Sequence, residues 1–191
     1  MEEITVKVLL LGDENTGKTT FNRRISGGGS SLDGKVPIAL LRDTDQPFIF
    51  EVRNRWRTYR LEFFDTSSPE NWRLLEPDLV LICYDISQRS SLTNMQNIWI
   101  KEVHSCFHNG DQLPKVVMGL KRDLRSEDDP NGVIYPQEGY RVAQEMRVDN
   151  YVECSAVTGE LLKLAFEEIC KMAAKTTTVT GAQSEGGCAI L

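Results

Sequence analysis

Eight consecutive residues near the N-terminus have the types and spacing of a phosphate-binding loop, Gly12-Asp13-Glu14-Asn15-Thr16-Gly17-Lys18-Thr19. They follow an apolar run, Ile4 to Leu11, that we expect to be a buried strand, and they precede a segment compatible with a helix. Glycines let backbone N–H groups turn toward phosphate oxygens, and the helix start adds partial positive charge. Lys18 can reach the β- and γ-phosphates, and the Thr19 hydroxyl can bind Mg²⁺. The predicted phosphate contacts are Glu14, Asn15, Thr16, Gly17, Lys18, Thr19 and Thr20.

The length and composition indicate a soluble globular protein. The 191 residues suit one domain, and the hydrophobic content of 40% and charged content of 26% are ordinary. The net charge of −6 gives no bulk attraction to nucleic acid or anionic lipid, so we expect no nucleic-acid partner. No apolar run reaches the length of a membrane span, and the N-terminus does not resemble a signal peptide. Five cysteines without paired spacing indicate reduced thiols, three of them in the core.

Strands and helices alternate along the chain, which predicts an open α/β sheet. The next two expected strands after the phosphate loop and its helix are Phe48–Arg53 and Trp56–Asp65. They are close enough in the sequence to form a hairpin. The expected later strands are Leu79–Tyr84, Val116–Leu120 and Tyr151–Glu153, and the expected helices are a short one within 66–77, then Ser87–Phe107, Pro136–Met146 and Glu160–Lys175. We therefore expect a mostly parallel six-stranded sheet with one antiparallel hairpin strand and helices on both faces. Arginines around the hairpin either protect a sheet edge, the interpretation we favour, or form a docking patch for an acidic partner.

Three further groups of polar residues follow predicted strands, and ligands bind beyond the carboxyl ends of strands in such sheets. Asp65 ends the hairpin, where an acid can support Mg²⁺ bound at the phosphate loop. Lys121 and Asp123 follow a buried strand; the carboxylate can accept hydrogen bonds from N1–H and the 2-amino group of guanine, which adenine lacks. Ser155 and Ala156 follow the last strand, where backbone N–H groups can meet the guanine oxygen. We predict guanine contacts from these four residues and Mg²⁺ contacts from Thr19 and Asp65.

In this order the motifs resemble those of small GTPases of the Ras superfamily, and most closely the Rho family, over essentially the whole chain. The matching segments are the loop Gly12–Thr19, Asp65-Thr66 of the second switch, Lys121–Arg125 of the guanine motif, and the Rho-like Tyr135–Gln137 and Glu153–Ala156. The resemblance implies a P-loop NTPase fold of the small-GTPase type, with a GTP-binding domain over residues 1–175. It also implies GTP or GDP and Mg²⁺ as ligands, a monomer, and protein partners that include effectors and an exchange factor.

The C-terminal residues resemble a lipid-modified tail. Residues 176–187 are polar and predicted to be disordered, and the chain ends in Cys188-Ala189-Ile190-Leu191, which resembles a prenylation box whose terminal leucine favours geranylgeranyl. Residues 172–187 contain only Lys175 as a cation, and a single prenyl chain gives reversible membrane binding. We expect the chain to be cytoplasmic and peripheral on the cytoplasmic face of membranes through Cys188, with a prenyl-binding chaperone as a candidate partner.

The sequence departs from the family at the positions that serve hydrolysis. Glu14 replaces a glycine close to the γ-phosphate, where a side chain crowds the attacking water. A carboxylate about 6 Å from a phosphate oxygen is repelled by about 3 kcal/mol per unit charge at an effective dielectric near 20, which Arg42 or another arginine could offset. Ser68 replaces the glycine that senses the γ-phosphate, and Pro69 replaces the glutamine that orients water.

Other departures affect the first switch and the base. Alignment gives Ile38 where the family has a Mg²⁺-binding threonine, and Thr44 could serve only if this loop is rearranged. No aromatic residue lies between Phe21 and Phe48, so the ring that stacks on guanine is missing. Leu120 replaces a polar residue before Lys121.

These features support two main hypotheses. The first is a Rho-like membrane-associated switch or scaffold that binds GTP or GDP with Mg²⁺ and hydrolyses GTP slowly, with no residue assigned as catalytic. The alternative is a pseudo-GTPase, a non-enzymatic interaction module with little or no nucleotide. A third, an ATP-using P-loop kinase, is disfavoured because Asp123 and Ser155-Ala156 indicate guanine.

Overall fold

The computed structural model describes residues 3–27, 32, 47–53, 57–65, 69–128, 132–177 and 189–190. Its strands are β1 (Glu3–Leu11), β2 (Phe48–Arg53), β3 (Thr58–Phe64), β4 (Leu79–Asp85), β5 (Lys115–Leu120), β6 (Asn150–Glu153) and β7 (Ala189–Ile190). Its helices are α1 (Lys18–Ile25), α2 (Pro69–Trp72), α3 (Arg89–Asn94), α4 (Ile100–Cys106), α5 (Pro136–Glu145) and α6 (Leu162–Thr176), with a π-helix η3 (Met95–Trp99) and a 3-10 helix η4 (Arg122–Leu124). Within the described ranges, we find no helix with both the length and the apolar character needed to span a membrane.

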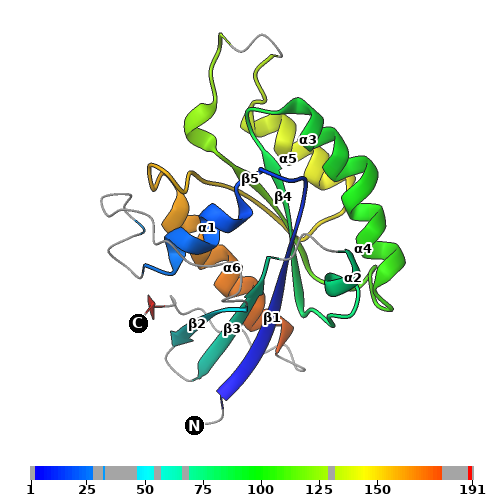
Figure 1. The fold of residues 1–191 in the computed structure, drawn as a ribbon, viewed down its shortest axis with the longest axis vertical. Helices are drawn as coiled ribbons and strands as arrows, with labels where there is room; N and C mark the ends of the chain where they lie inside the picture. Colours follow the sequence, from blue (N-terminus) through cyan, green and yellow to red (C-terminus); the bar gives the residue numbers. More distant parts are fainter. Residues whose placement is uncertain are drawn as a thin grey trace.

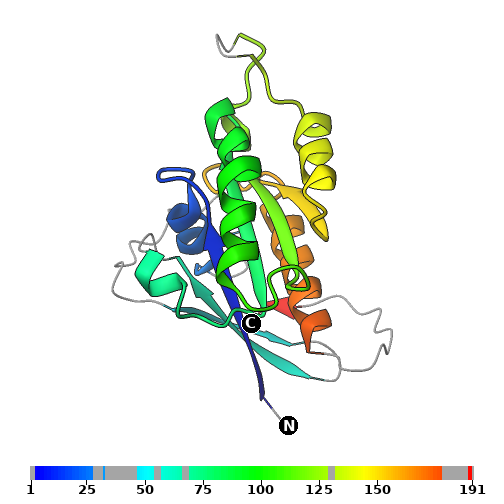
Figure 2. The same ribbon diagram turned by 90° about the vertical axis from the view of Figure 1, so that its right-hand side faces the viewer.

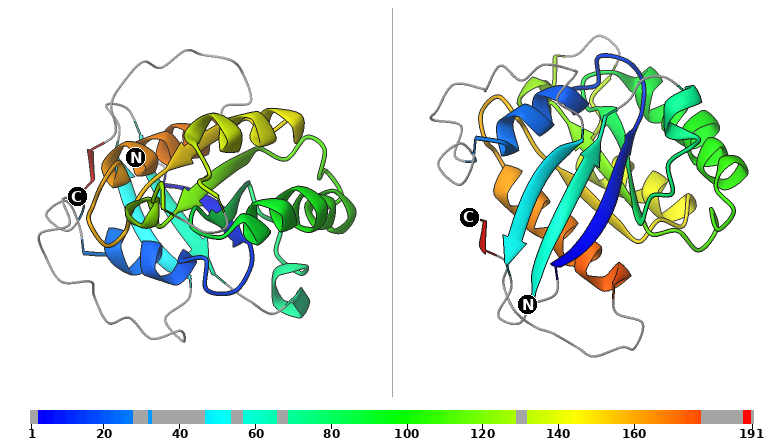
Figure 3. Two further views of the ribbon diagram at one scale, coloured as in Figure 1. Left: turned by 90° about the horizontal axis from the view of Figure 1, so that it is seen from above. Right: turned by 60° about the horizontal axis from the view of Figure 1, so that its bottom comes forward.

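The strands form one sheet in the order β6-β5-β4-β1-β3-β2-β7. Strands β1, β3, β4, β5 and β6 are parallel, and β2 runs antiparallel to β3. The predicted six strands and antiparallel hairpin strand are therefore confirmed. The two-residue β7 adds a short antiparallel pairing to the edge of β2, with Val52 opposite Ile190 (Figure 3).

Helices cover both faces of the sheet, as predicted. Figure 1 shows α1 and α6 on one side of the sheet and α3, α4 and α5 on the other. Alternate residues of β1 explain this arrangement, because side chains alternate across a strand. Val8 and Leu10 belong to the buried cluster under α1 and α6, whereas Leu9 and Leu11 belong to the cluster under α3, α4 and α5.

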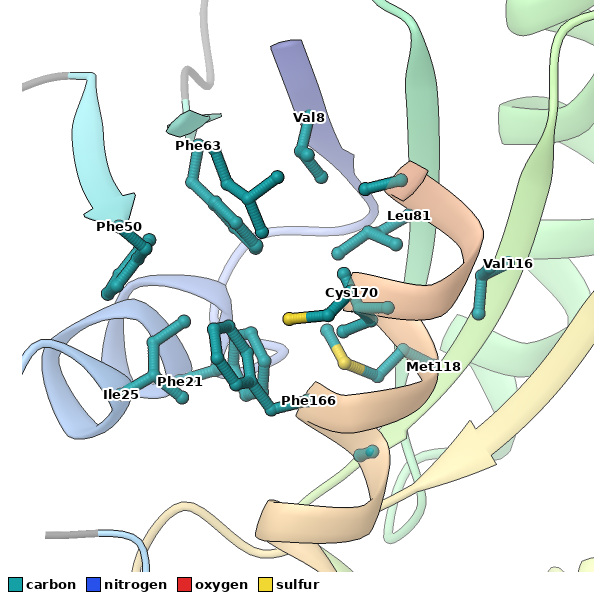
Figure 4. Packing of buried hydrophobic residues seen from close by; sticks show 14 of the residues in the cluster. Val8, Phe21, Ile25, Phe50, Phe63, Leu81, Val116, Met118, Phe166 and Cys170 are labelled. Carbon is teal, nitrogen blue, oxygen red and sulfur yellow. The ribbon is translucent and has the colours of Figure 1, made fainter. Parts of the chain in front are cut away.

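Aromatic rings fill the first cluster between the hairpin and α6 (Figure 4). The ring of Phe50 lies 5.0 Å from that of Phe63 and 5.8 Å from that of Phe166, both edge-on. Such contacts add about 0.5–1.5 kcal/mol beyond area burial. Cys83, Cys154 and Cys170 are buried free thiols, which agrees with the predicted three core cysteines.

The predicted helix Ser87–Phe107 is one continuous rod but not a uniform α-helix (Figure 2). Its central turn is the π-helix η3, where the N–H of Ile100 donates to the carbonyl of Met95. The extra residue in this turn shifts the phase of the buried face. The helical spacing of Leu92, Met95, Ile98, Trp99 and Val103 predicts that all five lie in the core. For Ile98 this prediction is wrong, since its residue is 47% exposed, whereas Met95 and Val103 are fully buried.

Candidate functional site

The phosphate loop joins β1 to α1 and depends on glycine at its first position. Gly12 has a φ of +142°, which L-residues rarely adopt, and a Cβ there would lie 2.2 Å from the carbonyl oxygen of Cys83 in β4. Gly17, at the start of α1, has a φ of +105°. Substitution at Gly12 would therefore displace the loop from the sheet.

The loop folds around the ammonium group of Lys18, which is 9% exposed. Nζ donates to the carbonyl oxygens of Gly12 at 3.0 Å and Asp13 at 2.7 Å, and it lies 3.4 Å from Oγ1 of Thr16. The Thr16 hydroxyl also donates to the Asp13 carbonyl at 3.0 Å. Lys18 thus has a fixed position within the predicted phosphate site, whereas Glu14 and Asn15 are exposed at its rim.

Thr19 and Asp65, the two predicted Mg²⁺ ligands, lie side by side. The Thr19 hydroxyl donates to Oδ2 of Asp65 at 2.5 Å, although the two residues are 46 positions apart. Mg²⁺ prefers oxygen ligands and usually keeps several waters besides one or two carboxylates and substrate phosphates. A hydroxyl and one carboxylate therefore fit this ion. No cluster of three or more His, Cys, Asp or Glu residues that could hold a metal occurs in the described part of the chain.

A cavity of about 200 Å³ lies next to the loop, beyond the carboxyl end of β5. Its lining residues are Gly17, Thr20, Leu120, Lys121, Asp123, Leu124, Ala156 and Val157. Three of the four predicted guanine contacts thus line one cavity, and Thr20, predicted at the phosphates, lines it too. None of the lining residues is aromatic, and leucine and valine side chains supply the apolar walls.

Ser155, the fourth predicted guanine contact, lies behind this cavity. It is completely buried, and its hydroxyl donates to Oδ1 of Asp123 at 2.5 Å while it accepts from the N–H of Thr158. Asp123 itself is exposed. The Ser155 hydroxyl therefore fixes the orientation of the Asp123 carboxylate at the edge of the cavity.

Lys121 has a charged partner that sequence reasoning missed. Its Nζ donates to Oδ2 of Asp85 at 2.7 Å, and Asp85 is only 4% exposed. The other carboxylate oxygen of Asp85 accepts from the N–H and hydroxyl of Ser87. A buried acid at the end of β4 was the available signal. This ion pair directs the Lys121 stem, whose Cγ and Cε would lie 3.7 Å from a Cβ on Gly17.

Glu153 at the end of β6 anchors the chain on both sides of Asp123, one of the predicted guanine contacts. Its carboxylate accepts from Arg125 at 2.6 and 2.9 Å, from Arg122 at 2.8 Å and from the Tyr151 hydroxyl at 2.5 Å. Burial alone would raise the pKa of Glu153, but the hydrogen bonds from Arg125 and Tyr151 outweigh it and hold this pKa below its usual range. Burial also raises the pKa of Tyr151. Sequence reasoning did not identify this network.

Arg24 links α1, the helix that follows the phosphate loop, to the segment after β6 that lines the cavity. It is 3% exposed, and its Nε and Nη2 donate to the carbonyls of Ala156 at 2.5 Å and Val157 at 3.0 Å. The sequence alone did not single out Arg24, because its partners are more than a hundred residues away.

Several residues that the sequence analysis singled out fall outside the described residues, namely Ile38, Arg42, Thr44, Thr66, Ser68 and Cys188. Pro69 begins the four-residue α2, which is the short helix expected there. Trp72 at its end is 2% exposed, and its ring centroid lies 6.0 Å from that of Phe107. Arg73 pairs with Glu102 of α4 at 2.9 Å. Helix α2 is therefore held against α4.

Comparison with known proteins agrees with this geometry. The sequence model of the Ras family matches residues 7–175. The chain is 30% identical over 169 residues to the GTP-binding protein RHO4 of Eremothecium gossypii. The aligned region covers 84% of this chain and 61% of that protein. It is 28% identical over 182 residues to the Rho-related protein racM of Dictyostelium discoideum, covering 91% and 90% of the two chains. It is 29% identical over 181 residues to the GTP-binding protein RHO1 of Candida albicans, covering 86% of each. The chain therefore belongs to the Ras family and is a small GTPase of the Rho type.

Proposed function

We propose that this protein binds GTP and GDP together with Mg²⁺, hydrolyses GTP slowly, and acts as a membrane-associated signalling switch or scaffold. The observation that carries the proposal is the contact between Thr19 and Asp65 beside the phosphate loop and the base cavity. Three chain segments bring the Lys18 cation, the Thr19 hydroxyl and the carboxylates of Asp65 and Asp123 to one edge of the sheet. That set matches the phosphates, metal and base of a guanine nucleotide.

Each residue group has a defined task in nucleotide binding. Lys18 and the backbone N–H groups of the loop hold the phosphates, and Thr19 and Asp65 hold the metal. Bound Mg²⁺ would supply positive charge to neutralise the β- and γ-phosphate oxygens. Asp123, oriented by Ser155, accepts hydrogen bonds from the guanine edge, and the backbone at Ala156 faces the guanine oxygen. Leu120, Leu124 and Val157 take the place of a stacking ring as apolar walls.

Slow hydrolysis follows from groups that are absent from the sequence. Pro69 has no side-chain amide to orient a water molecule, and Ser68 replaces the glycine that senses the γ-phosphate. Glu14 lies exposed at the rim of the loop, where its side chain would crowd the attacking water and its charge would be repelled by the γ-phosphate. The protein would be insensitive to activating proteins that supply an arginine, because that arginine works with the missing glutamine.

The domain organisation and membrane association are part of the same proposal. Residues 1–175 form the nucleotide-binding domain, and residues 176–191 form a tail that is prenylated at Cys188. One lipid chain without a polybasic segment gives reversible binding, so the protein exchanges between cytosol and membrane as a monomer, with effectors, an exchange factor and a prenyl-binding chaperone as partners. Replacing Cys188→Ser should move the protein fully to the soluble fraction; retention on membranes would contradict lipidation.

The nucleotide carried by freshly purified protein tests the proposal. We expect chromatography of the denatured protein to release GTP or GDP in near-equal molar amount, and single-turnover hydrolysis to be slower than in a Rho protein with glycine and glutamine at these positions. The variant Asp123→Ala should lose preference for guanine over adenine nucleotides. Hydrolysis as fast as in the ordinary Rho protein would refute the slow-hydrolysis part.

No described residue that lines the base cavity is aromatic, and this supports a second candidate, a pseudo-GTPase that works only as an interaction module. Leu120 and Glu14 favour it as well. Protein purified without nucleotide, whose melting temperature does not shift on addition of GTP and Mg²⁺, would select this candidate.

A further inference from the structure

Asp13 of the phosphate loop makes two side-chain hydrogen bonds to the helical rod on the other side of the site. Its Oδ2 accepts from Nδ2 of Asn94 at 2.8 Å, and its Oδ1 accepts from Nε1 of Trp99 at 2.7 Å. Each carboxylate oxygen thus has its own donor, so both the position and the orientation of the carboxylate are fixed. Hydrogen bonds to a charged acceptor are roughly twice as strong as neutral ones.

The π-turn of η3 makes these two donors converge. Residues five apart in an α-helix point about 140° away from each other around the axis. In η3 the backbone bond from Ile100 to Met95 closes a wider turn, which brings Asn94 and Trp99 to the same side. Turns of this kind interrupt the regular helix and are frequent at functional sites.

The carboxylate of Asp13 is connected to the phosphate-binding cation through its own main chain. The Asp13 carbonyl accepts from Nζ of Lys18 at 2.7 Å and from the Thr16 hydroxyl at 3.0 Å. At the other end, the Trp99 ring packs against the buried cluster under α3, α4 and α5. The loop is therefore tied to the core at the residue that orients Lys18.

We propose that Asp13, Asn94 and Trp99 form a positioning clamp that holds the phosphate loop in its nucleotide-binding conformation, and that the π-turn exists to build this clamp. The inference rests on the nucleotide site proposed above. None of the three side chains needs to touch the nucleotide, so they are positioning residues. Loss of the clamp loosens the loop, and bound nucleotide leaves faster while the core around Trp99 stays filled.

Dissociation of a fluorescent GDP analogue, measured by displacement with excess GDP, tests the clamp. Trp99→Phe keeps an aromatic ring but removes the N–H donor, and we expect about tenfold faster dissociation, equivalent to about 1.4 kcal/mol. Asn94→Ala should make dissociation about fivefold faster. Combining either change with Asp13→Asn should give less than the product of the single effects, because the pairs share one carboxylate. The matched control is Gln96→Ala, which removes an amide from the same turn that donates to Glu145 at 3.0 Å; its rate should stay within about twofold of wild type.

Amide hydrogen exchange over residues 12–19 in nucleotide-free protein provides a second measurement, which does not need bound nucleotide. Faster exchange in Trp99→Phe than in Gln96→Ala would support the clamp even if the wild type bound no nucleotide and the proposed function failed. Unchanged exchange in this segment, or dissociation rates within about twofold of wild type in both Asn94→Ala and Trp99→Phe, would overturn the clamp. A lower melting temperature in these variants, with no change in hydrogen exchange or nucleotide dissociation, would show that these residues contribute only to packing.

Discussion

The candidate site has two ends that differ in their surroundings. The base end comprises Lys121, Asp123 and Ser155 around the cavity, and the hydrolysis end comprises Glu14 and Pro69. At the base end, Lys121 pairs with buried Asp85, and Asp123 is oriented by buried Ser155. At the hydrolysis end, Glu14 is exposed, and Pro69 begins a four-residue helix whose Trp72 is anchored in the core. Binding and cleavage of a nucleotide use different groups, so a protein can keep one set and lose the other.

The difference also concerns coupling between residues. Glu153 joins Arg122 and Arg125, which flank Asp123, to β6. Loss of Glu153 would leave the Arg125 side chain, which is 15% exposed, without its charged partner, so substitution there costs stability as well as binding. An exposed residue such as Glu14 can change without that penalty. Folding therefore constrains the base end more strongly than it constrains the exposed Glu14 at the hydrolysis end.

Removing the phosphate-binding cation should produce the largest effect and would test whether the whole comparison concerns a nucleotide site. We expect Lys18→Ala to weaken GDP and GTP binding by about 100-fold or more, since a charged group with several hydrogen bonds is lost. Titration with a fluorescent nucleotide measures this. The control is Lys101→Ala on the exposed side of α4. Equal affinity in the Lys18 variant would mean that the loop does not hold phosphates.

Neutralising Glu153 should have the next largest effect and would test whether folding constrains the base end. We expect Glu153→Gln to lower the free energy of unfolding by about 2 kcal/mol at neutral pH, because the Arg125 guanidinium loses its charged partner and that of Arg122 keeps only Glu160. The folded-state pKa of Glu153 is depressed, so its stabilisation is present above the unfolded pKa of about 4.5 and is lost as the pH falls through the folded value.

Urea unfolding at neutral pH and in mild acid measures this difference. The gap between wild type and Glu153→Gln should shrink steadily as the pH is lowered below about 4. Glu168→Gln, which breaks an exposed pair with Lys171, is the control and should cost less than about 1 kcal/mol. A gap that widens in acid would contradict the pKa direction.

Sequence patterns predicted those strands, turns and helices whose own residues determine their local conformation. The phosphate-loop spacing fixed the strand, turn and helix around it, and continuous apolar runs identified buried parallel strands such as β4 and β5. Thr19 and Asp65 could be paired in advance only because the phosphate loop follows β1 and Asp65 follows β3, and both of these parallel strands end at one edge of the sheet. The resemblance to a family then supplied their order.

Contacts between distant residues could not be predicted in this way. Asp85 and Lys121 are 36 positions apart, Glu153 and Arg125 are 28 apart, and Arg24 and Ala156 are 132 apart. Polar periodicity does not encode such partners, since the residues around an acid in the sequence do not identify a partner from a distant segment. The π-turn was missed for a related reason, because apolar residues at Leu92, Met95 and Val103 fit an α-helix as well as one with an extra residue.

Restoring the family residues at the hydrolysis end should have a smaller effect and would test whether that end alone limits cleavage. We expect Glu14→Gly to raise single-turnover GTP hydrolysis about tenfold, since it removes a nearby negative charge and side-chain bulk. Adding Pro69→Gln should increase the rate further, because a side-chain amide becomes available. Affinity for GDP should change less than about threefold, and a larger change in affinity than in rate would break the separation of the two ends.

The smallest expected effect, at Asp85, tests whether the base end acts on binding alone. Asp85→Asn keeps a polar side chain of the same size at a position that is 4% exposed but removes the charge that holds Lys121. The Lys121 side chain is 32% exposed, so water can solvate its ammonium after the change, and the loss should be modest. We expect GTP and GDP to bind about fivefold more weakly, and equally so, because the Lys121 stem lines the cavity for the base that both nucleotides share. The hydrolysis rate of bound GTP should not change.

Asp111→Asn, at a side chain that is 90% exposed, is the control. If Asp85→Asn altered cleavage more than affinity, the two ends would be coupled through Lys121 and the loop it crosses at Gly17.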